Sequence, residues 1–129
     1  MFGDSQAFSS FSVDDTGRAR EFYGGTLGLD VREMHGMLEL RLPGGGRVVA
    51  YPKDDHLPAG FTVLNFAVRD LDGAVDALVR AGVTMQRYAQ FEHDERGVVR
   101  SPHGPPIAWF TDPAGNVISV LEDPDAPRD

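Results

Sequence analysis

Apolar and polar residues follow the same pattern in two stretches of this chain, Phe11–Ala19 and Phe66–Ala74. In each stretch, apolar residues at every second position predict a strand with one buried face. An aspartate then stands where a helix N-cap is expected, and apolar residues at helical spacing follow it. The positions shared by the two stretches are Phe11, Val13, Asp15 and Ala19 in the first, and Phe66, Val68, Asp70 and Ala74 in the second.

Short strand-like runs follow each stretch, so the pattern predicts a βαβββ module twice. The first module spans about residues 7–52, with strands at 7–13, 29–34, 37–42 and 47–51 and a helix that Asp15 begins and Gly28 ends. A polar linker covers residues 53–61. The second module spans about residues 62–122, with strands at 62–69, 83–88, 107–111 and 117–121 and a helix from Asp70 to Gly82. The polar tail at 123–129 is expected to fray.

Two modules that each occupy about half of a chain are expected to pack on each other, because a solenoid needs at least three units. We therefore predict one α+β domain over residues 1–129. In it, two tandem βαβββ modules form a cupped mixed sheet with the helices on the outer face. A chain of 129 residues is long enough for a hydrophobic core.

One face of each predicted strand packs on the helices, and the shared phenylalanine and valine positions indicate which face that is. The opposite face then carries Ser10, Ser12 and Asn65. If the leucines of the third predicted strand face the helices, Glu39 and Arg41 join them. A concave face of this mixed composition is typical of a ligand-binding site. An exposed Glu39–Arg41 ion pair of little energetic value explains the same two residues equally well.

Composition excludes several classes of partner. The net charge of −8 and a pI near 4.8 repel nucleic acid and anionic membranes and favour a cationic ligand, although simple solubility explains this charge as well. The chain has no cysteine, which excludes disulfides and thiolate chemistry and fits a reducing cytoplasm. It also lacks an apolar run long enough to span a bilayer and a basic-then-apolar N-terminal signal.

Three groups of residues together resemble a known family. They are the strand-ending Val-x-Asp pattern, Glu21–Tyr23 followed by Leu27–Leu29, and Phe110–Asn116 with its Asp-Pro-x-Gly-Asn turn. Over about residues 7–122 the chain resembles the vicinal oxygen chelate superfamily, which contains glyoxalase I, bleomycin resistance proteins and extradiol dioxygenases. The resemblance implies paired βαβββ modules, a small molecule bound in the cup, and a homodimer formed by modules of two subunits.

The metal-using branches of this superfamily place His, Gln or Glu at four matched strand positions. In this chain, those positions fall on Phe8, Val49 or Ala50, Val63 and Ser119. None of these side chains supplies a carboxylate or an imidazole to a divalent cation. The sequence therefore predicts no metal site and no cofactor, and it is similar to the antibiotic-sequestering branch that uses the cup without a metal.

Other candidate residues each allow a functional and a structural interpretation. The polar stretch at 90–106 contains Glu92 and His93, which either reach inward from a lid as a general base or belong to a solvated loop. The four histidines lie in predicted turns or loops, where they are usually solvated. Trp109 either stacks on a flat or cationic ligand or packs in the core. The same two interpretations remain open for Tyr51.

We predict a metal-independent protein that binds, and through binding sequesters, a small molecule in the cup. The alternative is a glyoxalase-type lyase or isomerase that moves a proton of an α-carbonyl substrate through Glu39 or Glu92. A dioxygenase ranks below both, because iron needs ligands that this sequence lacks. The expected partners are a small molecule and a second copy of the chain, with no nucleic acid and no membrane. The predicted ligand-binding residues are Ser10, Ser12, Arg41, Tyr51, Asn65, His93, Trp109 and Ser119.

Overall fold

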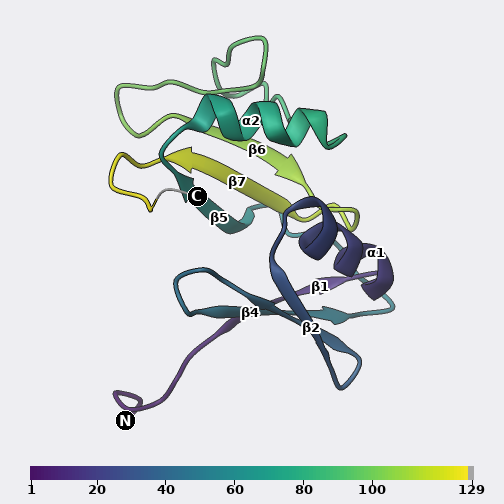
Figure 1. Cartoon of the computed structure of the whole chain (residues 1–129). Coiled ribbons are helices and arrows are strands. Elements are labelled where there is room, and N and C mark those ends of the chain that lie inside the picture. The colour runs from purple at the N-terminus through teal and green to yellow at the C-terminus, as the bar shows by residue number, and fades with distance from the viewer. Residues whose placement is uncertain (128–129) are drawn as a thin grey trace. The chain divides into compact units, whose positions relative to one another are not determined.

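The computed structural model describes residues 1–127 and divides the chain into two compact units (Figure 1). The first unit is Met1–Pro58, and the second begins at Ala59. The division falls within the predicted linker at 53–61. Each unit contains one sheet and its own helical segment, so the predicted mixed α+β fold is confirmed.

The sheet of the first unit has four strands in the order β1-β4-β3-β2. Strand β1 runs parallel to β4, whereas β3 is antiparallel to both β4 and β2. The predicted strands are all present, within one or two residues at their ends. Their bounds are β1 Ser9–Val13, β2 Asp30–Met34, β3 Met37–Arg41 and β4 Arg47–Pro52.

The helix of the first unit begins at the predicted cap. The Asp15 carboxylate accepts a hydrogen bond from the Arg18 backbone N–H at 3.0 Å, and helix α1 (Thr16–Arg20) follows. The chain then widens into a π-helical segment, η1 (Glu21–Thr26), in which the Leu27 N–H donates to the Phe22 carbonyl. The helical segment ends before Gly28, whose φ of +76° lies in the left-handed region that glycine adopts without strain.

The sheet of the second unit has three strands in the order β5-β7-β6. Strand β5 (Thr62–Val68) is parallel to β7 (Val117–Glu122), and β6 (Ile107–Thr111) is antiparallel to β7. Helix α2 (Leu71–Arg80) begins where predicted, because the Asp70 carboxylate accepts from the Gly73 N–H at 3.0 Å. The two repeated stretches therefore form the same strand-cap-helix unit in both halves of the chain.

The strand predicted at 83–88 is wrong. Met85 makes an isolated bridge to Phe110, and the Gln86 N–H donates to the Trp109 carbonyl at 2.8 Å. Val99 pairs with Ile107 at the other end of β6. The free edge of β6 is divided between two separate segments, so neither of them extends into a ladder.

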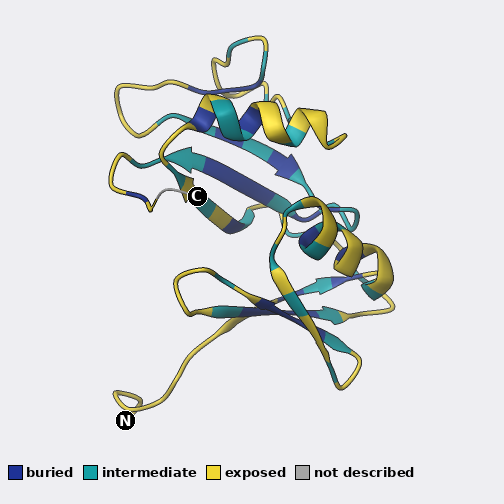
Figure 2. Ribbon diagram, viewed as in Figure 1, coloured by how far each residue is buried: buried dark blue, intermediate teal, exposed yellow. Residues whose placement is uncertain are grey.

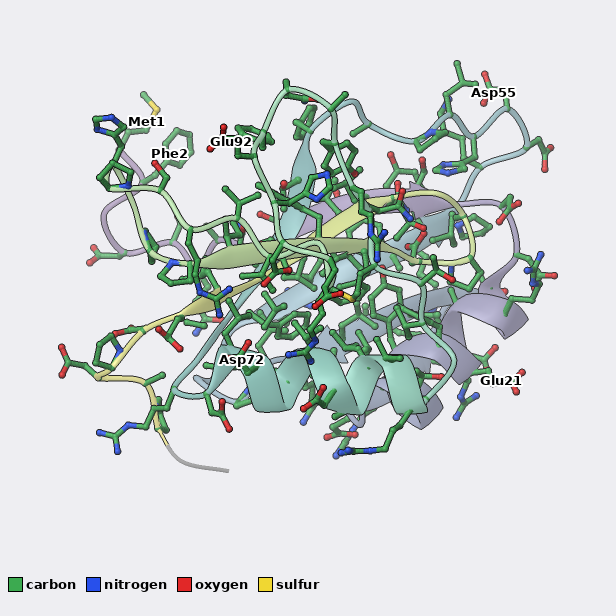
Figure 3. All side chains as sticks on the ribbon, turned by 90° about the horizontal axis from the view of Figure 1, so that it is seen from above. Met1, Phe2, Glu21, Asp55, Asp72 and Glu92 are labelled. Carbon is green, nitrogen blue, oxygen red and sulfur yellow. The ribbon has the colours of Figure 1, made fainter. Side chains whose placement is uncertain are left out.

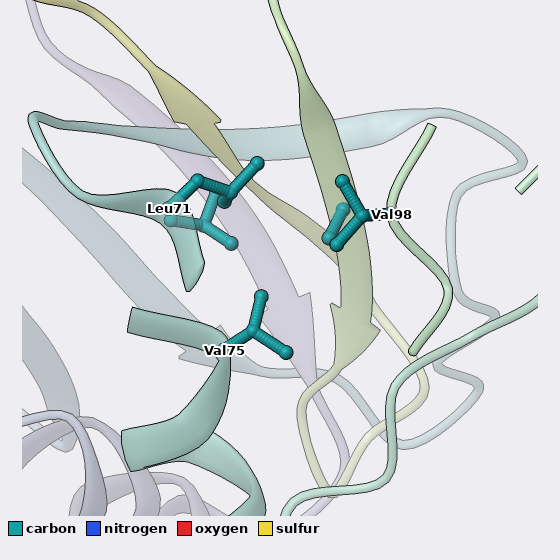
Figure 4. Packing of buried hydrophobic residues seen from close by; sticks show 5 residues of the cluster. Leu71, Val75 and Val98 are labelled. Carbon is teal, nitrogen blue, oxygen red and sulfur yellow. The ribbon is translucent and has the colours of Figure 1, made fainter. Parts of the chain in front are cut away.

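The core of the second unit lies between α2 and the sheet. It is a cluster of buried side chains that includes Leu71, Val75 and Val98 (Figure 4). Phe66 and Val68 pack against this cluster, which confirms the face of β5 predicted to meet the helix. In the first unit, Phe11 and Val13 are buried as predicted, and Figure 2 shows how burial varies along the chain.

Two segments outside the helices and strands are well defined. In the predicted turn at 112–116, the buried Asp112 carboxylate accepts from the backbone N–H groups of Ala114 and Asn116 and from the Asn116 amide. The predicted tail turns at Asp123 and buries Ala126, so its described part is ordered rather than frayed. The rest of the tail, residues 128–129, lies outside the described residues.

Candidate functional site

The face of the first sheet opposite the buried Phe11 and Val13 carries the predicted polar residues. In the strand register, Ser10 lies beside Val49, which lies beside Glu39. Ser12 lies beside Tyr51 in the same way. Because side chains alternate along a strand, these residues share one face of the sheet.

Glu39 is held on this face by two arginines. Its carboxylate accepts from Arg41 Nε at 2.7 Å and from Arg47 Nη1 at 3.3 Å, and the residue is only 8% exposed. The hydrogen bond from Arg41 is the main reason that the pKa of Glu39 is lowered from its ordinary value, with Arg47 adding to the effect. Glu39 therefore forms an ion pair, as the structural interpretation predicts. Its carboxylate is mostly buried, whereas the side chains of Arg41 and Arg47 are partly exposed.

Arg47 is a partner that the sequence reasoning missed. It lies opposite Arg41 in the β3–β4 register, and its guanidinium stands 4.0 Å from the centroid of the Phe8 ring. The face thus presents one carboxylate between two guanidinium groups. The Glu39 carboxylate is therefore not free to pair with a cationic ligand.

His56 is a second residue that the sequence reasoning missed. Its Nδ1 lies 2.6 Å from Ser12 Oγ, and both side chains are half-buried. The Lys53 N–H donates to the Val13 carbonyl, and the His56 N–H donates to the Lys53 carbonyl, so the turn after β4 folds back over the end of β1. The predicted topology could have indicated this contact, because adjacent parallel strands end at the same edge of a sheet.

On the second sheet, three predicted site residues form one row across adjacent strands. Ser119 of β7 pairs in register with Asn65 of β5 on one side and with Trp109 of β6 on the other. The Ser119 hydroxyl, which is fully buried, donates to Asn65 Oδ1. This row lies on the face opposite Phe66 and Val68, which pack toward α2.

The Trp109 ring has partners on several sides. Its Nε1 donates to Thr62 Oγ1 at 3.2 Å. The Phe91 ring is stacked on it, with centroids 5.3 Å apart and an interplanar angle of 17°, and Tyr88 meets it edge-on at 5.7 Å. Burial raises the pKa of Tyr88. Trp109 is therefore half-buried beneath a loop and is not part of the cluster under α2.

The acidic stretch predicted as a lid or a solvated loop has two distinct parts. Glu92 and His93 are exposed, and Glu92 lies far from Asp72 of α2 (Figure 3). Asp94 instead faces inward, where burial opposes its ionisation but hydrogen bonds from the Val98 and Arg96 backbone and from Arg100 lower its pKa.

Two arginines tie the later part of this loop to α2. Arg96 pairs with Asp72 at 3.3 Å and also with Asp76. Arg100 pairs with Asp72 at 3.1 Å and with Asp94 at 2.9 Å. The loop is thus anchored on the helix side, while its tip carries Phe91 over Trp109.

The four strand positions at which the family resemblance would place metal ligands do not fit a metal ion here. Phe8, Val63 and Val49 or Ala50 have no donor atom, and the Ser119 hydroxyl is bonded to Asn65. Across residues 1–127, no group of three or more His, Asp or Glu side chains is placed to hold a metal ion. A divalent ion would have to find its ligands elsewhere.

Three surface grooves lie beside the helices. One groove of the second unit runs between the first half of α2 and the tail, with Asp70, Ala77 and Pro124 in its walls. Another lies between α2 and residues 83–87. In the first unit, a groove follows the helical segment and the start of β2. Within residues 1–127, no helix has the length and apolar character needed to cross a membrane.

Comparison with known proteins identifies relatives of the whole chain. The profile described as Glyoxalase/Bleomycin resistance protein/Dioxygenase superfamily matches residues 7–120. No curated protein matches the chain significantly.

Many solved structures share the fold. One superfamily member from Sphaerobacter thermophilus DSM 20745 has a TM-score of 0.74 and 24% identity, over 95% of this chain and 100% of that one. TnmS3, an antibiotic binding protein from Streptomyces sp. CB03234, has a TM-score of 0.72 and 23% identity, over 95% and 98%. A glyoxalase/bleomycin resistance protein from the same Streptomyces strain has a TM-score of 0.65 and 27% identity, over 91% and 99%.

Proposed function

Because the chain belongs to the Glyoxalase/Bleomycin resistance protein/Dioxygenase superfamily, we propose that it binds a small organic molecule without a metal ion. The observation that carries this proposal is the row of Asn65, Ser119 and Trp109 across three adjacent strands. The row places an amide, a hydroxyl and a large aromatic ring side by side. Ligand sites combine apolar and aromatic surface with a few fixed polar groups in this way.

The chemistry of the row suits a flat ligand with a polar edge. The Asn65 oxygen already accepts from Ser119, which fixes the orientation of the amide and leaves its two N–H groups as donors. Asn65 is exposed, so these donors are accessible. The Trp109 indole supplies the apolar surface. On the first sheet, Ser10, Ser12, Arg41 and Tyr51 stay ligand-facing positions predicted from the sequence.

Sequestration of a natural product is the form of binding that we favour. A structural relative, TnmS3, is an antibiotic binding protein, so an antibiotic is a candidate ligand for the present chain. The ligand-facing role of His93, the single-domain organisation, the homodimer and the cytoplasmic location are part of this proposal as predictions from the sequence.

Proton transfer of the glyoxalase type has less support. A general base works best when its pKa lies near the working pH, whereas Arg41 and Arg47 lower the pKa of Glu39. Glu92 is exposed at the loop tip. Neither Glu39 nor Glu92 is therefore well suited to remove a proton, and we propose binding without turnover.

Trp109→Ala tests the proposal directly. Planar aromatic compounds are screened by thermal shift, and their dissociation constants are then measured by calorimetry. The substitution is expected to weaken binding about 10- to 30-fold, since truncation of an aromatic anchor commonly costs about 1.5 to 2 kcal/mol. Trp109→Phe keeps a ring and should lose less, which controls for folding. Equal affinity of the wild type and Trp109→Ala would remove this row as the site.

A further inference from the structure

We infer that Phe91 competes with the ligand for the face of Trp109, and that it thereby restricts the site to planar aromatic molecules. The inference rests on the proposed function, because it concerns the same row of residues. It starts from a single contact: the Phe91 ring is stacked on the indole in the free protein. A flat ligand that stacks on this indole face has to displace Phe91.

Of the two stacked rings, Trp109 is the fixed one. It lies on β6, which pairs with β7 on one side, and its carbonyl accepts from the Gln86 N–H on the other. Its Nε1 donates to Thr62 Oγ1 of β5. Tyr88 packs against its edge. Phe91, by contrast, comes from a loop and is 43% exposed, an unusual degree of exposure for a phenylalanine that packs on another ring.

The loop that carries Phe91 is held at its two ends. The Gln86 N–H donates to the Trp109 carbonyl at one end, and the Asp94 N–H donates to the Val98 carbonyl at the other. The ion pairs of Arg96 and Arg100 fix this second end on α2. At the base, a Cβ on Gly97 would lie 2.9 Å from the Gln86 carbonyl oxygen, so the two ends approach closely.

Between these ends, the loop tip has few bonds of its own. Among the described residues, the backbone of 87–93 shows one hydrogen bond, from the Phe91 N–H to the Tyr88 carbonyl, and this bond lies within the tip. The stacking of Phe91 and the packing of Tyr88 on Trp109 therefore hold the tip over the row. Segments with few hydrogen bonds and exposed side chains open at low free-energy cost.

This arrangement selects ligands by shape. Displacing Phe91 gives up an aromatic stack, which corresponds to a factor of about 2 to 10 in an equilibrium constant. A planar aromatic ligand regains that stack on the same indole face, whereas an aliphatic ligand of equal size does not. Phe91 thus sets an affinity threshold that a ligand unable to stack on Trp109 does not reach, and the ligand class is a fused or linked aromatic ring system whose polar edge meets Asn65.

The test uses Phe91→Ala, with Phe91→Tyr as the variant that keeps the ring and Phe2→Ala as a control at another exposed phenylalanine. Trp109 is the only tryptophan, so its fluorescence reports on this site alone. Without ligand, acrylamide should quench Phe91→Ala more strongly than the other three proteins. The probes are proflavine, a planar tricyclic cation, and 1-aminoadamantane, an aliphatic cation.

Proflavine is expected to bind Phe91→Ala about 2- to 10-fold more tightly than the wild type, and to bind Phe91→Tyr and Phe2→Ala as the wild type does. The aliphatic amine should not bind the wild type measurably, and Phe91→Ala should bind it weakly, because no ring has to be displaced there. If the wild type binds proflavine and Phe91→Ala binds it equally well or more weakly, Phe91 does not compete with the ligand. The proposed site would still stand in that case. If proflavine binds neither the wild type nor Phe91→Ala, both the competition and the proposed aromatic site are wrong.

Discussion

Ser12 Oγ and His56 Nδ1 lie 2.6 Å apart, although 44 positions separate the two residues in the chain. The contact joins the end of β1 to the turn that follows β4. It also places an imidazole on a sheet face where sequence patterns indicate only hydroxyl, carboxylate and guanidinium groups.

Ser12→Ala should lower the free energy of unfolding by about 1 kcal/mol, because a half-buried hydrogen bond to His56 is lost. Urea unfolding at pH 7 measures this change. Ser10→Ala is the matched control, since Ser10 is an exposed serine two positions earlier on the same face, and it should stay within about 0.5 kcal/mol of the wild type. Equal effects of the two substitutions would contradict the role assigned to the contact.

Glu39 should make the stability of the protein sensitive to acid. Its pKa is lower in the folded protein than its ordinary value of 4.5, so the unfolded chain binds more protons in that range. The stabilisation is therefore complete above about pH 4.5 and is lost as the pH falls through the lowered pKa of the folded state. Urea unfolding between pH 7 and pH 3 should show a steeper acid loss in the wild type than in Glu39→Gln.

Glu33→Gln is the control for Glu39. Glu33 pairs with Arg20 in the same unit, but both side chains of that pair are more than half exposed. Exposed pairs contribute little, so this variant should follow the wild-type profile. If Glu39→Gln also follows it, the two arginines do not stabilise the Glu39 carboxylate in solution.

Gly97→Ala should destabilise the protein by about 1 to 2 kcal/mol more than Gly82→Ala. Both glycines have a φ in the left-handed region, +84° and +89°, so both substitutions carry the same backbone strain. At Gly97 the new Cβ would also meet the Gln86 carbonyl oxygen at 2.9 Å, whereas nothing lies within 4 Å at Gly82. Thermal or urea unfolding of the two variants measures the difference, and equal losses would show that the loop base relaxes freely.

Metal addition should leave the protein unchanged. The strand positions at which the family resemblance would place metal ligands hold Phe8, Val63 and other side chains without suitable donors, so we expect no stoichiometric metal in protein purified without chelators. Elemental analysis measures this directly. Added Zn²⁺, Ni²⁺ or Mn²⁺ should not raise the melting temperature, whereas a ligand at 100 times its dissociation constant stabilises by about 2.7 kcal/mol. About one metal ion per chain would instead favour the alternative function as a lyase.

Local chemistry is what the sequence predicts well. Asp15 and Asp70 cap their helices because a carboxylate reaches the N–H three residues later in any such context. Gly28 ends the first helical segment for an equally local reason, its positive φ. The faces of Phe11 and Phe66 follow from the two-residue period of a strand.

Contacts set by register or by a loop path were not predictable in the same way. Arg47 joins Glu39 only through the pairing of β3 with β4. Phe91 reaches Trp109 only because the loop base closes at Gly97, and no periodicity marks that closure. The strand predicted at 83–88 has a suitable composition, but it shares the edge of β6 with Val99.

The divided edge of β6 also bears on how the protein avoids self-association. An uncovered edge strand offers a continuous row of amide and carbonyl groups to any other chain. Here, the Gln86 N–H donates to the Trp109 carbonyl, and Val99 and Ile107 form two backbone hydrogen bonds with each other. Two short segments outside the strands therefore cover part of this edge of the second sheet and reduce its tendency to aggregate. This role is separate from ligand binding.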